Sequence, residues 1–163
     1  MDRIDVQLRE ELSHRIKRFN KHDQHRLFIS FLKFLQHQQD FSVLSGEQIR
    51  DFASRFNRLD LDAAESVKWN ASDSSMYMFI VVAGKVNLKG SEYFSGSFSQ
   101  GEIVMTMPLE ILEKELIIIE AVEDSQVAIL DKVKAEALIF DHPEFKNLFL
   151  DVAKNTNIIK HTA

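Results

Sequence analysis

The sequence predicts an α+β protein that is mainly β, with an antiparallel β domain between two helical segments. Three observations lead to this prediction: a helical hydrophobic period before residue 59, short strand-like runs over residues 76–130, and a return of the helical period afterwards. The 163 residues are enough for one domain with an appended segment. We therefore expect an N-terminal helical extension over residues 1–40 and a β domain with closing C-terminal helices over residues 41–163.

The N-terminal segment has the spacing of an amphipathic helix. Apolar residues recur there every three or four positions, at Ile4, Leu8, Leu12, Ile16 and Phe19. A second block, residues 27–35, is apolar on all sides, which favours a helix packed inside the protein.

A capping box marks the start of the next helix. The Ser45 hydroxyl can accept a hydrogen bond from the third helical N–H, while Gln48 reaches back to the Ser45 backbone. The buried stripe of this helix is expected at Ile49, Phe52, Ala53 and Phe56. We expect two or three helices before residue 59.

The middle of the chain changes to a strand-like pattern. Met76–Val82 is a β-branched and aromatic run, Gly84 is typical of a turn, and Val86 and Leu88 then alternate with polar residues. The further expected strands are Glu92–Ser95, Glu102–Met105, Leu116–Val122 and Val127–Leu130. Short strands separated by glycines favour an antiparallel sandwich or barrel over a parallel sheet.

The C-terminal segment is again helical, with candidates at residues 132–140 and after Pro143. The second of these helices has a mostly apolar stripe formed by Phe145, Leu148, Phe149, Val152, Thr156 and Ile159. This stripe packs either on the core of its own domain or on a partner helix in a homodimer. We predict an interaction surface here, made of Phe145, Leu148, Phe149, Val152 and Ile159.

The net charge of −5 hides an uneven distribution. Residues 1–58 hold eleven basic and eight acidic residues, whereas residues 59–130 hold four basic and twelve acidic residues. The basic front is interleaved with acids, which is typical of a solvated helix face, although it could also contact an acidic partner or the acidic part of this chain.

Composition excludes several kinds of site. The chain has no cysteine, so disulfides, thiolate metal sites and cysteine nucleophiles are excluded. None of the six histidines lies between residues 38 and 141, so the interior of the β barrel cannot carry a histidine metal site. A serine-hydrolase elbow and a Walker phosphate loop are also missing from the sequence. We expect no enzymatic activity, no cofactor and no metal.

The expected location is the cytoplasm. No apolar run approaches the roughly 18 residues of a membrane-spanning helix. The charged N-terminus lacks the apolar core of a secretory signal.

The order of elements resembles the cyclic-nucleotide-binding domain family, the β-roll of catabolite activator proteins and kinase regulatory subunits. MYMFIVVAGKVNL, which includes Gly84, is similar to the family's strand, turn glycine and next strand. FSQGEI resembles the turn that enters its phosphate-binding cassette, with Gly101 and Glu102 in place of Gly-Asp. AVEDSQVAILDKVKAEALIFDHPEF is similar to the last two strands and the following helix. The resemblance covers roughly residues 41–150 and implies an antiparallel double-stranded β-helix, or jelly roll, with flanking helices.

The resemblance also implies a degenerate ligand pocket. The family holds its ligand with a Gly-Glu pair, whose Glu binds the ribose hydroxyl, and an Arg that binds the phosphate. Those positions correspond here to Met105, Thr106 and Glu115. No arginine follows Arg58 in the sequence, so the strand region after residue 58 cannot supply a bidentate guanidinium to a phosphate.

These observations predict a non-enzymatic regulatory or interaction module that does not bind cyclic nucleotides in the usual pose. Its partner would be another protein or a second copy of the chain, with a homodimer through the C-terminal helix as one form. About twenty residues follow Pro143, so we expect no helix-turn-helix module for DNA. The alternative is a sensor of a cyclic nucleotide or another small ligand through a divergent pocket near Met105, Thr106 and Glu115, either held differently or completed by an arginine from the helical front or a second subunit.

Overall fold

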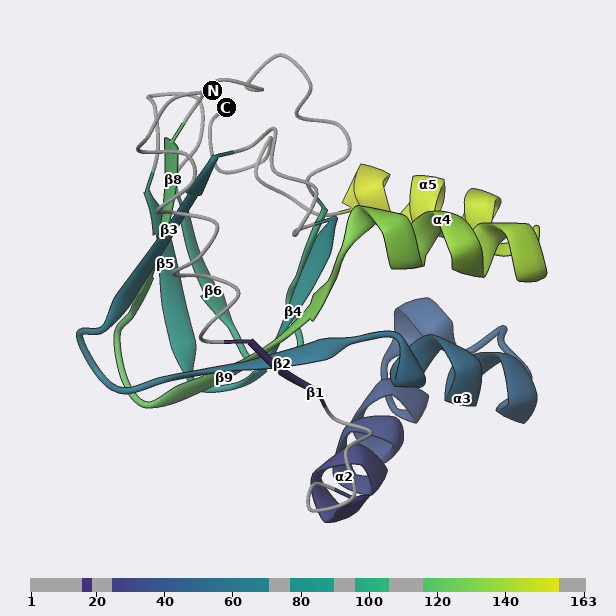
Figure 1. The fold of residues 1–163 in the computed structure, drawn as a ribbon, viewed down its shortest axis with the longest axis horizontal. Coiled ribbons are helices and arrows are strands. Elements are labelled where there is room, and N and C mark those ends of the chain that lie inside the picture. Colours follow the sequence, from purple (N-terminus) through teal and green to yellow (C-terminus); the bar gives the residue numbers. More distant parts are fainter. Residues whose placement is uncertain (1–15, 19–24, 71–76, 90–95, 106–115, 156–163) are drawn as a thin grey trace.

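The computed structural model describes residues 16–18, 25–70, 77–89, 96–105 and 116–155 (Figure 1). The helical elements are α2 (His25–Gln36), the 3₁₀ turn η2 (Gln39–Phe41), α3 (Gly46–Ser54), α4 (Lys132–Asp141) and α5 (Phe145–Asn155). The strands are β1 (Ile16–Arg18), β2 (Asn57–Leu61), β3 (Ser66–Asn70), β4 (Met78–Ala83), β5 (Lys85–Lys89), β6 (Gly96–Ser99), β7 (Ile103–Met105), β8 (Leu116–Ala121) and β9 (Ser125–Leu130).

The described strands form two antiparallel sheets. One sheet has the order β1-β2-β9-β4-β7, and the other has the order β3-β8-β5-β6. The chain passes back and forth between the two sheets, as it does from β2 to β3, β4 and β5. This topology confirms the expected antiparallel β-roll with flanking helices.

Strands β4, β7 and β9 of the five-stranded sheet are buried on both faces, and strand β4 shows how. Phe79 and Val81 point into the roll, whereas Met78 and Ile80 point to the helical side. This explains why the sequence of β4 is a continuous apolar run. Strand β5 lies in the four-stranded sheet, and there Val86 and Leu88 are buried while Lys89 is exposed.

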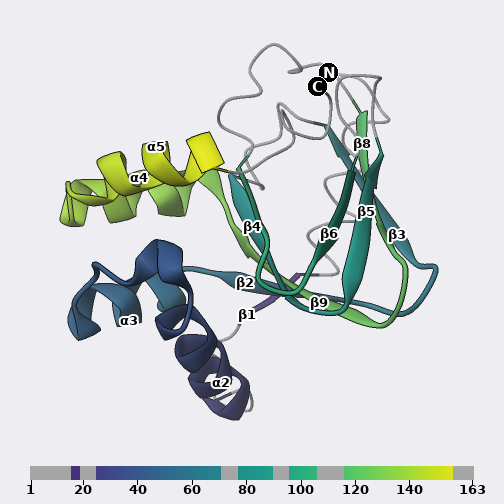
Figure 2. The same ribbon diagram turned by 180° about the vertical axis from the view of Figure 1, so that it is seen from behind.

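All the described helices gather on the outer side of the five-stranded sheet (Figures 1 and 2). Their apolar side chains and the outer residues of β4, β7 and β9 form one cluster, which we call the helical core. Its members are Phe31, Leu32, Leu35, Phe41, Ile49, Phe52, Ala53, Phe56, Tyr77, Met78, Ile80, Ile103, Met105, Ala128, Leu130, Ala135, Leu138, Phe145, Phe149 and Val152. None of the described helices is long and apolar enough to span a membrane.

Three local predictions are wrong or incomplete. Ile16, expected on a helix, belongs to β1, where it pairs with Leu59 at the edge of the five-stranded sheet. The open edge of β2 offers backbone hydrogen bonds that override a helical side-chain pattern. The N-terminal part of that expected helix and the strand expected at residues 92–95 lie outside the described residues. Strands β2 and β3 were not expected, although Leu59 and Leu61 alternate with polar neighbours as a half-buried strand requires.

The apolar block at residues 27–35 forms α2, but this helix is not buried on all sides. Phe31 and Leu35 lie in the helical core, while Ser30 and Lys33 are exposed. The expected capping box at Ser45 is present, because Ser45 and Gln48 exchange both hydrogen bonds.

Gly84 is the turn residue between β4 and β5, as the sequence predicts. Its φ is +87°, and a Cβ built there would lie 2.3 Å from Ser125 Oγ and 2.5 Å from the Asp124 carbonyl oxygen. Both the backbone conformation and the space around it therefore require glycine.

We expect Gly84→Ala to lower the free energy of unfolding by at least about 1 kcal/mol, measured by urea denaturation. The alanine would have a strained backbone conformation, and its Cβ would clash with Ser125 and the Asp124 carbonyl oxygen. The matched control is Gly46→Ala, because a Cβ at Gly46 meets nothing within 4 Å. Gly46→Ala should leave stability unchanged or raise it by roughly 0.5 kcal/mol. Equal losses in the two variants would contradict this account of the turn.

Candidate functional site

The predicted pocket begins at the turn between β6 and β7. Gly101 has a φ of +90°, and its N–H donates to the Val81 carbonyl oxygen at 2.8 Å. The Glu102 carboxylate accepts a hydrogen bond from the Ser99 N–H at 3.0 Å. The Gly101 bond holds the turn against β4, and the Glu102 bond stabilises the turn itself. Both residues therefore stabilise the fold.

Met105 ends β7 and pairs with Met78 of β4. Its side chain is buried in the helical core and not in the interior of the roll. The structure thus brings Gly101, Glu102 and Met105 together on one connection. Thr106 and Glu115, the other two predicted pocket residues, lie outside the described residues, so the pocket itself stays a prediction.

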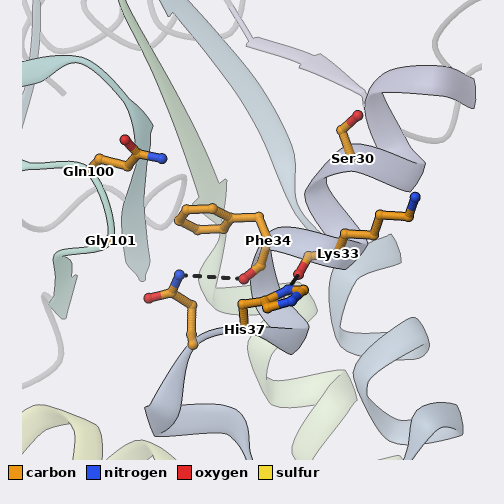
Figure 3. A pocket seen from close by; sticks show the side chains of 7 residues that line it. Ser30, Lys33, Phe34, His37, Gln100 and Gly101 are labelled. Atoms are coloured by element: carbon orange, nitrogen blue, oxygen red, sulfur yellow. Dashed lines mark hydrogen bonds between the residues drawn. The ribbon is translucent and has the colours of Figure 1, made fainter.

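The structure adds a groove between α2 and the β6–β7 turn (Figure 3). Its volume is about 540 Å³. The lining residues are Ser30, Lys33, Phe34, His37, Gln38, Gln100 and Gly101. Sequence reasoning found only Gly101 among them, because the fold joins positions that are more than sixty residues apart. The spacing of the polar residues Ser30 and Lys33 in α2 and of His37 just after it was the available signal.

The groove is open and combines apolar surface with several polar side chains. Lys33 and His37 are exposed, and His37 Nδ1 lies 2.7 Å from the Lys33 carbonyl oxygen. The Gln38 amide donates a long 3.4 Å hydrogen bond to the Phe34 carbonyl oxygen. Such a groove can contact a polar or acidic group, but these residues do not combine a nucleophile with an oriented base. Within the described part of the chain, no group of three or more His, Cys, Asp or Glu side chains could hold a metal ion.

Phe52 of α3 is the centre of the aromatic packing between the helices. Its ring lies 5.2 Å from the Phe145 ring and 5.8 Å from the Phe149 ring, centroid to centroid. On its other side it lies 5.0 Å from Phe41 and 4.9 Å from Phe56. One side chain thus joins α3 to α5, and pairs of this kind stabilise beyond the area they bury.

The C-terminal stripe therefore belongs largely to the chain's own core. Phe145, Phe149 and Val152 are buried in the helical core, and Leu148 packs against it. Of the two alternatives for this stripe, the structure bears out core packing for these side chains, so they do not form an open interaction surface. Ile159 lies outside the described residues.

A polar cluster closes the same helix junction. Arg55 Nε and Nη2 bind the two carboxylate oxygens of Asp51, each at 3.0 Å, and Arg55 Nη2 also lies 2.6 Å from Asp141 Oδ2. His142 Nε2 lies 2.9 Å from Asp51 Oδ2. Gln48 adds a hydrogen bond to Glu144. These contacts tie α3 to the α4–α5 junction.

The cluster shifts the pKa values of Asp51 and Arg55, the two groups at its centre. The Arg55 hydrogen bonds lower the pKa of the Asp51 carboxyl, and the His142 contact lowers it further against the opposing effect of burial. The same Asp51 contact raises the pKa of Arg55. Arg55 is therefore committed to neighbouring carboxylates.

Arg58, the last arginine in the sequence, does not face the roll interior. Its cross-strand partner on β9 is Ala128, a helical-core residue, and paired residues share one face of a sheet. Its side chain is 8% exposed, and Arg58 Nε lies 3.1 Å from Asp60 Oδ2. The roll interior is instead lined by apolar residues such as Phe79, Phe98 and Val104.

Comparisons with solved structures identify the fold as that of cyclic-nucleotide-binding domains. A cyclic-nucleotide-binding domain from Methylobacillus flagellatus KT is 14% identical, with a TM-score of 0.58, over 82% of this chain and 83% of that one. The regulatory subunit of a cAMP-independent protein kinase A from Trypanosoma cruzi, bound to guanosine, is 13% identical with a TM-score of 0.59, over 84% and 49%.

The catabolite activator protein of Thermus thermophilus is 21% identical with a TM-score of 0.55, over 69% of this chain and 55% of that one. The chain thus spans about half the length of the kinase subunit and of the activator. No protein-family model matches the sequence, and the comparison with curated proteins finds no match.

We expect Asp51→Asn to lower the free energy of unfolding by about 1 kcal/mol near neutral pH, because the charged hydrogen bonds are partly screened by solvent. The folded-state pKa of Asp51 lies below its ordinary value of 3.8. Its contribution is therefore complete above that value and is lost as the pH falls through the lower folded-state pKa. Urea denaturation from pH 7 down to pH 3 should show the difference between wild type and variant shrinking below about pH 4.

Asp62→Asn is the matched control, because Asp62 is exposed in the connection between β2 and β3. It should change stability little at any of these pH values. A pH-independent deficit of Asp51→Asn would contradict the charged role of this carboxylate.

Proposed function

We propose that this chain is a non-enzymatic regulatory and interaction module that does not bind a cyclic nucleotide in the pose usual for its fold. The observation that carries the proposal is the distribution of arginine. None follows Arg58 in the sequence, and Arg58 itself is directed to the helical side and paired with Asp60. A cyclic phosphate would lack the bidentate guanidinium on which the usual pose depends.

Charge supports the same conclusion. Residues 59–130 hold twelve acidic and four basic residues. If Glu115 occupies the position of the phosphate-binding arginine, a carboxylate would face the phosphate where a cation is needed. Two like charges that lose water cost several kcal/mol.

The helices give the module its output. Phe52 joins α3 to α5, and Arg55 joins α3 to the α4–α5 junction. A displacement of one helix would therefore change the packing of the other. The recipient would be a separate partner protein or a second copy of the chain in the cytoplasm. The extension over residues 1–40, with its basic residues, is a further candidate contact.

A second candidate function is the sensing of a ligand without a phosphate. The kinase regulatory subunit from Trypanosoma cruzi is described as cAMP-independent and bound to guanosine. A nucleoside has no phosphate that a guanidinium would bind, so the missing arginine would not exclude a nucleoside ligand. In this alternative the ligand occupies the divergent pocket near Met105, Thr106 and Glu115.

Isothermal titration calorimetry separates the two candidates. Cyclic AMP, cyclic GMP and cyclic dinucleotides should give no saturable heat with the intact protein at micromolar concentrations. Guanosine and adenosine form the second arm, and saturable binding of a nucleoside alone would favour the sensor. Micromolar binding of a cyclic nucleotide would overturn the proposed function.

A gain-of-function variant tests the assignment of the pocket positions. Glu115→Arg together with Thr106→Glu should create measurable cyclic AMP binding, because it restores the phosphate cation and the ribose acceptor. Glu113→Arg with Thr106→Glu is the matched control, since it adds the same charges two positions away. No gain in the first variant, or equal gains in both, would show that the positions are assigned wrongly.

A further inference from the structure

Helix α4 has an apolar face that the described chain leaves uncovered. Val133 is 68% exposed, Phe140 is 86% exposed, and Ala137 is also exposed. Their spacing of four and then three residues places them on one side of the helix. We call these three residues the outer face of α4.

The opposite side of α4 is already occupied. Ala135 and Leu138 are buried in the helical core, and Ile139 packs against it. The helix therefore has two apolar sides, of which one is used inside the chain. An apolar patch containing a phenyl ring this exposed is typical of an interaction site.

The spacing of the outer face is symmetric about its centre. In an antiparallel pair of α4 helices centred between Glu136 and Ala137, Val133 lies opposite Phe140 of the second copy, and the reverse contact follows by symmetry. The small Ala137 side chain lies close to the two-fold axis, where it permits close approach of the helices. The outer face of α4 in one copy can thus cover the outer face of α4 in a second copy.

The charges beside the outer face suit this arrangement. Lys134 and Asp141 lie on the same side of the outer face, and an antiparallel two-fold brings Lys134 within two residues, about 3 Å along the axis, of Asp141 of the second copy. On the other side Glu136 approaches its own counterpart. Lys132, one turn earlier on that side, can neutralise this contact.

The distribution of charge over the whole chain also favours association through the side of the molecule that carries α4. Residues 131–163 hold five basic and five acidic residues, whereas residues 59–130 have a large acidic excess. Two copies therefore repel each other less through α4 than through the roll. In Figures 1 and 2, α4 and α5 extend away from the roll, which leaves room for a second molecule.

We infer that the outer face of α4 binds a second copy of this chain in an antiparallel, two-fold arrangement. This inference rests on the proposed role as an interaction module, and it names the partner and the surface. One helix face buries less than the ~800 Å² per partner of a standard interface. We therefore expect a weak dimer, with a dissociation constant on the order of 100 µM.

Sedimentation equilibrium of the intact protein from about 10 µM to 1 mM tests the dimer, since this range brackets the expected constant. The average mass should rise from that of one chain towards that of two. Val133→Glu and Phe140→Glu should each keep the protein at the mass of one chain. Val43→Glu is the matched control, because Val43 is 79% exposed but lies outside α4, and it should behave as wild type.

Cysteine pairs test the antiparallel register, because the natural chain contains no cysteine. Under mild oxidation Ala137→Cys should form covalent dimers by itself, whereas Val43→Cys should not. Val133→Cys should be linked efficiently only when mixed with Phe140→Cys. Each variant carries a single cysteine, so every disulfide must join two chains.

Three outcomes would overturn the inference: a wild-type mass of one chain up to 1 mM, a dimer that both glutamate variants leave intact, or self-linking of Val133→Cys as strong as that of the mixture. Circular dichroism of each variant confirms that it is folded. None of these outcomes involves a nucleotide, so failure of the dimer is separate from failure of the proposed function, which the calorimetry tests.

Discussion

Strands β4, β7 and β9 of the five-stranded sheet are apolar on both faces, and much of the structure depends on this constraint. Strand β4 supplies Phe79 and Val81 to the roll and Met78 and Ile80 to the helices, so the sheet is stable only while both sides are covered. The four-stranded sheet covers one side, and α2, α3, α4 and α5 must cover the other. The helices are therefore part of the core of the protein.

Phe52 shows how this covering is organised. It contacts Phe41, which precedes it in the sequence, and two rings of α5 that follow it by more than ninety residues, so α3 packs directly against α5. Asp51 and Arg55, on the same helix, add charged contacts to the α4–α5 junction. Apolar and polar contacts thus meet at one junction between α3, α4 and α5. The account of function follows from this coupling and from the charge of the roll, which is unfavourable for an anionic ligand.

The sequence was sufficient for the fold class, because the strand period, the turn at Gly84 and the capping box at Ser45 are local signals. It was insufficient where tertiary contacts determine the secondary structure or the burial of a residue. Ile16 has helical spacing but pairs with Leu59 at a sheet edge, and the stripe containing Phe149 could be assigned to the core only once Phe52 was seen against it. The groove beside Gly101 could not be predicted, because Lys33 and Gln100 meet only in the folded chain. Thr106 and Glu115 remain sequence-based assignments.

The central claim is that the β6–β7 region of this fold does not receive a cyclic phosphate. Two-dimensional amide NMR of the isotope-labelled protein, titrated with cyclic AMP, tests this claim at the residues concerned. The account predicts that the amide signals of Gly101, Glu102 and Met105, and those of α5, keep their positions. Saturable shifts centred on these residues would contradict it.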